Sequence, residues 1–381
     1  MKEIISEYFS DIEDTRCQCD VDHKLVNVLI LVMCSVLCGI DELDKMVIFG
    51  REKLKFLNKY FSINMIPSKS TLTRIMNMIN ADIVAKKIIF IMLDLIGSDG
   101  KIVAIDGKTI CSTAKKNSSR EKLHLITAYL TNNGVTLGQL AVNEKTNEIP
   151  VLRDLLTLID ITGKIVTADA MHCQTETAAA IIDAGGDYAL GLKGNQETFF
   201  NEVSTYIEDC IADQTIEVES AQTFEKNRDR IERRTCYKAP TLDWFENKDD
   251  WKGLTSVFAI HRKTTIKNET SEEMSFYISS LDESPERFLE IVREHWKIES
   301  MHYQLDVVFS EDDCRILSSN GQKAVSIFRK MALCLHKSYI ENNVTKTKPS
   351  VAGNMFKALI STDHLLKIIT SVFLQHNSNK L

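Results

Sequence analysis

Two short apolar segments of this chain each run into a single aspartate. The first is residues 101–106 (KIVAID), and the second is residues 164–169 (KIVTAD). Runs of this length, rich in β-branched residues, predict buried strands, and an aspartate at the end of such a strand has its backbone held by the sheet. If the strands are neighbours, Asp106 and Asp169 lie close together, where like charges repel unless a cation lies between them. The pattern therefore predicts a site for a pair of divalent metal ions, whose usual chemistry is phosphoryl transfer.

Length, charge and cysteine content narrow the class of protein. The chain has 381 residues, enough for two or three domains, and its formal net charge of −7 does not by itself indicate a nucleic-acid binder. Any such function must depend on local basic patches. The 10 cysteines lack the paired spacing of a zinc site, so we interpret them as free thiols of a protein in a reducing cytosol.

The most apolar run, residues 25–40, predicts a buried helix. Its 16 residues fall short of a membrane span, which requires roughly 20 residues. Residues 1–14 are mixed and acidic, so we expect no signal peptide. A cytoplasmic protein without a membrane partner is the expected outcome.

The first part of the chain, residues 1–98, predicts a helical N-terminal domain. Apolar residues recur at helical spacing from Leu25 to Ile40, and a second amphipathic stretch covers residues 43–61. Ser68 then precedes a helix that carries Arg74, which is a typical capped helix start. A capped third helix with basic residues fits a helix-turn-helix DNA reader, and it equally fits a bundle that packs on the next domain.

The region 99–340 predicts an α/β domain that begins after the glycine-containing boundary at residues 97–100. Strands are expected at residues 102–110, 123–130, 135–143, 165–168 and 188–192, with helices at 149–161 and 176–184. An antiparallel hairpin that leads into parallel strands through crossover helices is the strand order of a ribonuclease H-like mixed sheet. A β-rich insertion at about residues 200–285 and a helical C-terminal segment and tail at 341–381 complete the expected organisation.

The helix expected after the insertion offers candidates for a third metal ligand. Four ionisable side chains recur at three- and four-residue spacing and share one helix face: His295, Glu299, His302 and Asp306. Asp306 competes with Glu299 for this role, as do the carboxylates that follow it, Glu311, Asp312 and Asp313. A solvated polar face is the plainer interpretation, so the spacing alone leaves the third ligand open.

Two basic stretches flank the predicted site. One lies around the first aspartate (Lys108, Lys115, Lys116, Arg120, Lys122), and the other lies in the insertion (Lys226, Arg228, Arg230, Arg233, Arg234, Lys238). Such patches suit contacts to a phosphate backbone, although basic stripes are also common on ordinary solvated surfaces.

The segment Gly107-Lys108-Thr109 has the residue types of a phosphate-binding P-loop, but Ile102 stands where that motif needs its first glycine. Nucleotide hydrolysis through a P-loop is therefore excluded. We expect Gly107 instead to let the chain turn at the end of the strand.

Taken in order, these motifs resemble the DDE transposases of bacterial insertion sequences, in the branch that includes the H-repeat-associated proteins. The matching segments are residues 66–74 (IPSKSTLTR), 104–108 (AIDGK), 168–172 (ADAMH), 192–196 (LKGNQ), 230–234 (RIERR) and 295–307 (HWKIESMHYQLDV). Some related transposases carry Tyr, Arg and Lys around the glutamate where this chain has Val292, His295 and Asp306. The ordered set extends over roughly residues 10–365.

The resemblance implies a catalytic, metal-binding triad of Asp106, Asp169 and Glu299, with two Mg²⁺ or Mn²⁺ ions. It implies a DNA transposase that cuts the ends of an insertion sequence and joins them to a target. The implied partners are the terminal inverted repeats, the target DNA and a second copy of the chain, at the nucleoid of a bacterial cytoplasm. DNA contacts are then expected from Lys108, Lys193, Asn195, Arg230, Arg234, His295 and His302.

Three other classes remain open on the sequence. The chain could be a degenerate transposase that binds DNA without cutting it, or another ribonuclease H-like metallonuclease that only hydrolyses. A phosphotransferase for a substrate other than nucleic acid is more distant. Strand transfer, as opposed to cutting alone, separates a transposase from a simple nuclease.

Overall fold

The structure is a computed structural model that describes residues 2–9, 12–14, 16, 21–110, 122–142, 147–213, 218–267, 269–343 and 348–373. The basic residues Lys115, Lys116 and Arg120 lie outside the described residues. No helix in the described ranges is long and apolar enough to cross a membrane.

Helices form the N-terminal region, as predicted: α1 (Lys2–Phe9), α2 (Leu25–Leu37), α3 (Leu43–Glu52), α4 (Leu54–Phe61), α5 (Lys69–Met78) and α6 (Ala81–Ile96). The helix α2 is apolar on nearly all sides and almost completely buried, which is what such a composition requires. The predicted cap is present, because the side chain of Ser68 accepts a hydrogen bond from Thr71 N at 3.1 Å. The amphipathic stretch at 43–61 is two helices, because α3 ends at Glu52 and the chain turns at Lys53 into α4.

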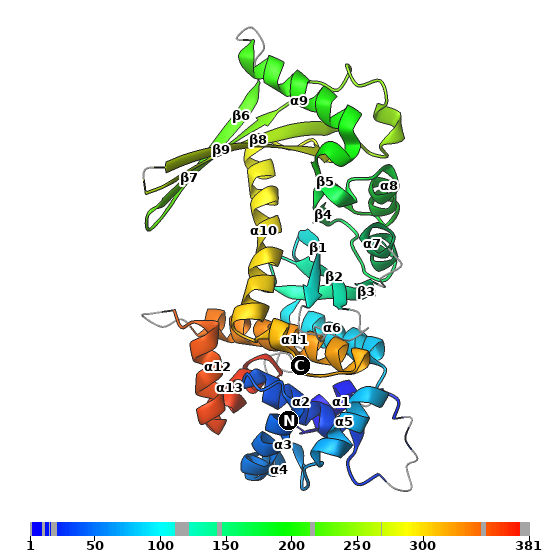
Figure 1. Ribbon diagram of the computed structural model, residues 1–381, viewed down its shortest axis with the longest axis vertical. Helices are drawn as coiled ribbons and strands as arrows, with labels where there is room; N and C mark the ends of the chain where they lie inside the picture. The colour runs from blue at the N-terminus through cyan, green and yellow to red at the C-terminus, as the bar shows by residue number, and fades with distance from the viewer. Residues whose placement is uncertain are drawn as a thin grey trace, which may run out of the picture.

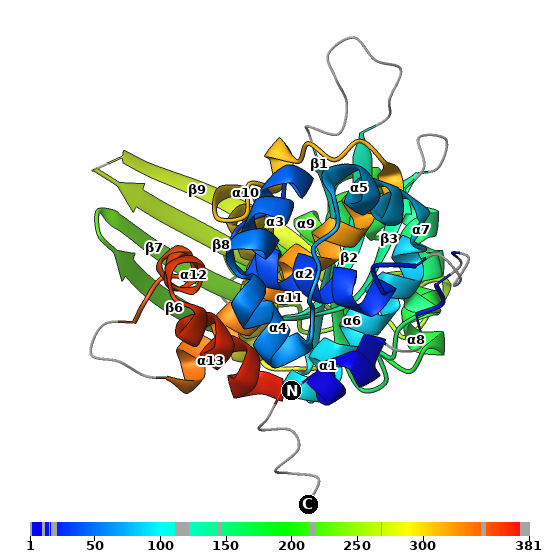
Figure 2. The ribbon, with the colours of Figure 1, turned by 90° about the horizontal axis from the view of Figure 1, so that it is seen from below.

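The two ends of the chain share one helical core. The helix α11 (Ser319–Asn342) packs against α2, α5 and α6, and α12 (Val351–Ile360) and α13 (Thr362–Phe373) pack against α11. Figure 2 shows α11 running beneath the N-terminal helices, with α12 and α13 beside them. The apolar side chains of α11 therefore lie in the same hydrophobic cluster as those of α2 and α6.

The central sheet has the predicted strand and helix order. It comprises β1 (Ile102–Ile110), β2 (Leu123–Leu130), β3 (Val135–Val142), α7 (Glu148–Leu156), β4 (Ile165–Ala168), α8 (Thr175–Asp183), β5 (Asp187–Leu192) and α9 (Glu197–Ala212). In space the strands follow the order β3-β2-β1-β4-β5, with β1 antiparallel to β2 and parallel to β4. This arrangement confirms the predicted ribonuclease H-like mixed sheet.

The predicted β-rich insertion continues this sheet. Its strands are β6 (Glu219–Asn227), β7 (Arg230–Lys238), β8 (Ser256–Ile266) and β9 (Glu269–Ser279). The last of them pairs antiparallel with β5, from Ala189 opposite Ser279 to Leu192 opposite Phe276, so one sheet of nine strands results. Figure 1 shows the far ends of β6–β9 projecting beyond the rest of the molecule.

The helix α10 (Pro285–Val307) links the two parts of the molecule. Ser284 caps it by accepting a hydrogen bond from Arg287 N at 3.5 Å, and Pro285 occupies its first turn, where proline is well tolerated. The helix passes over β6, β7, β4 and β1 and reaches the helical core through Ile298, Met301 and Leu305. In Figure 1 it stands between the sheet and the helical region.

Candidate active site

Asp106 and Asp169 each come directly after the last residue pair of the parallel strands β1 and β4. The parallel pairing of β1 with β4 ends at Ile105 opposite Ala168, and the next residue on each strand is Asp106 or Asp169. The strand β4 ends there, whereas β1 continues to Ile110 and stays paired with β2. The strand expected at residues 102–110 is therefore confirmed, whereas the placing of Asp106 at its end and the predicted turn at Gly107 are wrong, because both residues lie in mid-strand.

One face of α10 is turned toward these aspartates. The Nδ1 atom of His302 lies 3.2 Å from Asp106 Oδ2, and the Nε2 atom of His295 lies 3.5 Å from Asp169 Oδ1. Thr167 bonds the other nitrogen of His295 at 2.9 Å, so this ring is held between β4 and Asp169. The structure thus brings both histidines of the predicted helix face to the site.

Glu299 lies between the two histidines on the same helix and experiences the charge of both aspartates. Burial raises its pKa, the nearby carboxylates of Asp106 and Asp169 raise it further, and the two histidines oppose the shift. The hydrogen bond from His295 is the main cause that lowers the pKa of Asp169, against the effect of burial. Three carboxylates therefore share one electrostatic environment, in which a further negative charge is unfavourable.

The chemistry of this donor set fits a hard divalent cation. Carboxylate oxygens are the ligands that Mg²⁺ prefers, and mutual repulsion among three carboxylates is relieved by a cation between them. In the described residues, no group of three or more His, Cys, Asp or Glu side chains is already arranged around a metal position. In this conformation the imidazole rings of His302 and His295 occupy positions beside the carboxylates.

A cavity of about 380 Å³ opens beside Asp169 and Glu299. It lies between the ends of β4 and β5, the insertion strands β7, β8 and β9, and α10. Besides Glu273, the lining includes basic and aromatic side chains: Lys193, Arg234, Arg262, Phe276, Tyr277 and Trp296. The guanidinium of Arg262 lies 5.5 Å from the ring centroid of Trp296, within the range of a cation–π contact. The cavity is therefore suited to an anionic ligand with flat, apolar parts.

The comparison with known families is decisive for the class of protein. A family model described as "Transposase DDE domain" matches residues 97–335, and a second, described as "DDE_Tnp_1-associated", matches residues 6–90. The chain belongs to the DDE transposase family. The predicted resemblance is confirmed by these two matches, which together extend over both the helical region and the sheet.

Named relatives agree with this assignment to the DDE family. "Putative transposase YncI" of Escherichia coli O157:H7 is 35% identical over 367 residues, which are 91% of this chain and 91% of the relative. "H repeat-associated putative transposase YhhI" of Escherichia coli (strain K12) is 33% identical over 379 residues, 96% of this chain and 97% of the relative. The predicted likeness to the branch with the H-repeat-associated proteins is thus confirmed.

Among solved structures, the chain is similar to one described as "Cryo-EM structure of piggyBac transposase synaptic complex with hairpin DNA (SNHP)". The TM-score is 0.41 and the identity 9%, over 98% of this chain and 77% of that chain.

Several side chains that the DDE resemblance assigned to DNA are engaged within the protein. Asn195 donates hydrogen bonds to Ala170 O at 2.7 Å and to Cys173 O at 3.4 Å, so it holds the segment that follows Asp169. Lys193, by contrast, is exposed at the edge of the cavity.

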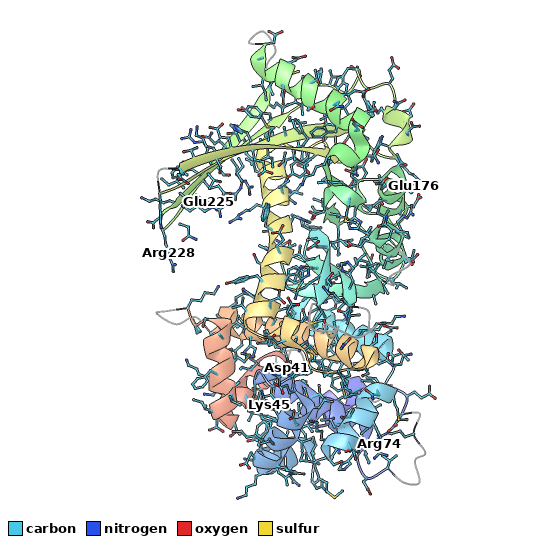
Figure 3. The ribbon with its side chains drawn as sticks, viewed as in Figure 1. Asp41, Lys45, Arg74, Glu176, Glu225 and Arg228 are labelled. Atoms are coloured by element: carbon cyan, nitrogen blue, oxygen red, sulfur yellow. The ribbon has the colours of Figure 1, made fainter. Side chains whose placement is uncertain are left out.

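The two arginines of the insertion are paired with glutamates. Arg230 contacts Glu232, and Arg234 contacts Glu232 and, at 3.3 Å, Glu225. Figure 3 shows Glu225 near the tip of the β6–β7 hairpin, where Arg228 projects outward. Much of the basic charge expected from the sequence is therefore balanced inside the sheet.

Lys108 belongs to a buried network of charges between β1 and the C-terminal end of α10. Its ammonium group contacts Asp306 and lies 3.0 Å from Glu311 Oε2. Glu311 also faces the buried guanidinium of Arg329, which contacts Asp41. These contacts connect β1, α10 and α11, and they place Asp306 opposite a lysine, whereas Glu299 faces the aspartates.

A second group of polar side chains adjoins the aspartates from the other side of β1. His124 Nε2 lies 2.8 Å from Glu148 Oε1, and His172 Nε2 lies 3.6 Å from Glu148 Oε2. His172 is predicted only as part of the segment 168–172, and no sequence pattern predicts His124 or Glu148 as site residues. Asn147 before Glu148 is a sequence signal for a helix start. The neighbouring residues do not indicate that this helix start lies close to Asp106 in the folded chain.

Proposed function

We propose that the chain is an active DNA transposase that cuts the ends of an insertion sequence and joins them to target DNA by metal-dependent phosphoryl transfer. The observation that supports this most strongly is the placement of three carboxylates. Asp106 and Asp169 follow the last pair of two parallel strands, and Glu299 comes from the helix that crosses them. Membership of the DDE family supports the same activity.

In this proposal Asp106, Asp169 and Glu299 hold the divalent ions. Such ions, when bound, lower the pKa of the attacking water or hydroxyl group and stabilise the leaving oxygen. The protein's own contribution is to fix the carboxylates. Gly107 N donates a hydrogen bond to Asp106 Oδ1 at 2.8 Å while His302 faces Oδ2, so both oxygens of Asp106 are oriented before DNA binds.

The cavity beside Asp169 is proposed to receive the DNA strand. Lys193 can neutralise phosphate charge and the exposed ring of Trp296 can stack on a base, whereas Arg262 is already paired with Glu273. Arg230, Arg234 and His295 are kept in the proposal as more distant or indirect contacts, because each is already paired within the protein.

The N-terminal helices are proposed to read DNA through α5. Its capped start and the exposed Arg74, labelled in Figure 3, place a basic side chain on the surface of the helical region. We retain the division into a helical domain at 1–98, a catalytic domain at 99–340 and a C-terminal segment at 341–381. A homodimer that holds two element ends in the bacterial cytoplasm completes the proposal.

The test uses linear DNA that carries the verified ends of the element, together with a supercoiled target. With Mg²⁺ or Mn²⁺ the wild-type protein is expected to produce both cut ends and ends joined to the target, and chelation by EDTA should abolish both products. Cutting without joining would instead identify a metallonuclease. Binding without either product would identify a degenerate transposase.

Lys193 provides a prediction for the DNA path. Replacing Lys193 by Ala should weaken binding of end DNA and of unrelated DNA alike, and should reduce the slope of log affinity against log salt by about one unit, because one phosphate contact is lost. The measurement is fluorescence anisotropy over a range of salt concentrations. Lys252→Ala, which removes an exposed partner of Asp183, is the matched control and should leave the slope unchanged.

A further inference from the structure

Glu148 is a carboxylate close to the candidate active site that is not part of the proposed triad. It opens α7, and Asn147 caps that helix through a hydrogen bond from Ile149 N at 3.5 Å. Two histidines converge on its carboxylate: His124 Nε2 at 2.8 Å from one oxygen and His172 Nε2 at 3.6 Å from the other. A carboxylate in the first turn of a helix is common, because its negative charge interacts favourably with the helix dipole. That interaction does not require two histidines beside the carboxylate.

Gly107 connects Glu148 to the candidate active site. A Cβ atom built on Gly107 would lie 2.6 Å from Glu148 Oε2 and 2.9 Å from His124 Nε2, so a side chain at this position would force the ends of Glu148 and His124 to move. The same residue donates its N–H to Asp106 Oδ1 at 2.8 Å. Two carboxylates therefore approach one glycine, which is needed here for close approach and not for a turn.

His172 connects Glu148 with the segment that follows Asp169. It lies three residues after Asp169, and its side chain is 1% exposed. In the part of the chain that the structure describes, its Nδ1 atom has no hydrogen-bond partner, which is unusual for a buried polar atom. Its Nε2 atom faces Glu148 Oε2, so the ring lies between the segment that follows Asp169 and the start of α7.

We propose that Glu148 is a fourth carboxylate of the site, which binds a divalent cation together with Asp106, and that His124 and His172 are positioning residues that hold it there. This inference rests on the proposed function, since it concerns the same metal-dependent site. The physical reason is charge. A fourth carboxylate at Gly107, one residue along β1 from Asp106, adds negative charge that a cation or the two histidines can balance. His124 and His172 affect the cation only by orienting Glu148. Replacing either histidine should therefore also weaken metal binding.

The first test measures Mn²⁺ binding by the full-length protein through the electron paramagnetic resonance signal of free Mn²⁺, with and without end DNA. We expect Glu148→Gln to weaken Mn²⁺ binding by about 10- to 100-fold, the range typical when a group that supports a metal site is lost. The control Glu176→Gln alters a glutamate in the first turn of the neighbouring helix α8, which is labelled in Figure 3, and should bind as the wild type does.

The outcomes distinguish this inference from the proposed function. If Glu148→Gln binds Mn²⁺ as the wild type does while Asp169→Asn loses binding, the fourth carboxylate is refuted and the metal-dependent function stands. If the wild-type protein binds no Mn²⁺ in either condition, both proposals are overturned.

A second measurement locates the ion without any variant. Wild-type protein loaded with Fe²⁺ in place of Mg²⁺ is treated with ascorbate and hydrogen peroxide, which cut the backbone near the bound iron. We expect cuts beside both Gly107 and Glu148. Cuts near Asp169 and Glu299 with none near Glu148 would overturn the inference.

Discussion

Asp169→Asn is expected to slow the cutting of element ends by about 10³-fold, because loss of a metal-binding charge removes several kcal/mol of transition-state stabilisation. Asparagine has nearly the same shape as aspartate, so the packing of the segment after β4 and the approach of His295 should be preserved. The change therefore tests the charge of the residue and not its size.

The measurement is the single-turnover rate of cutting of labelled end DNA in Mg²⁺. The control Asp154→Asn alters an exposed aspartate on α7 that the proposed site does not include, and it should cut at the wild-type rate. Equal thermal denaturation midpoints would show that both variants are folded. If Asp169→Asn cuts as fast as the wild type, the triad assignment is wrong.

The second large effect concerns stability. Arg329→Met should reduce the free energy of unfolding by about 3–5 kcal/mol, because it removes a buried positive charge that faces two carboxylates, Glu311 and Asp41. Arg329 and Glu311 are each 1% exposed, and Arg329 also contacts Asp41 in the connection between α2 and α3. Burial by itself raises the pKa of Glu311, but the charges of Arg329 and Lys108 outweigh it and lower that pKa overall.

The pH dependence of this network follows from the direction of that shift. Because the folded state lowers the pKa of Glu311, the charged form stabilises the fold above the pKa of an unfolded glutamate, which is about 4.3. This contribution is lost as the pH falls through the lowered value. Urea denaturation at neutral and acidic pH should therefore show a smaller difference between wild type and Arg329→Met at acidic pH.

The control for this experiment is Arg153→Met, which removes a more exposed arginine that lies 3.8 Å from Glu176. An exposed pair contributes about 0–1 kcal/mol, so its loss should shift the denaturation midpoint little. Equal losses of stability in the two variants would contradict the assignment of Arg329 to a buried network.

The candidate site was largely readable from local sequence patterns. Short apolar runs rich in β-branched residues marked the strands before Asp106 and Asp169, and helical spacing placed His295, Glu299 and His302 on one face. The strand order then made the two aspartates neighbours, and the structure brings the helix face to them. These inferences succeed because strand and helix periodicities are local properties of the chain.

Other features depend on contacts between residues far apart in the chain. The pairing of β9 with β5, the common core of α2 and α11, and the approach of Glu148 to Gly107 all have this character. Likewise, Lys108 and Asn195 carry motifs that suggest DNA, yet their polar groups bond to Asp306 and to the backbone after Asp169.

What the amino-acid sequence alone could specify was therefore the set of elements, the order of the ribonuclease H-like strands and the residues at their ends. Tertiary structure alone decided which polar groups are consumed within the protein and which face the cavity. The physical reason is that hydrogen bonds and ion pairs satisfy buried polar groups with whatever partner the fold brings near, and that partner has no fixed distance along the chain.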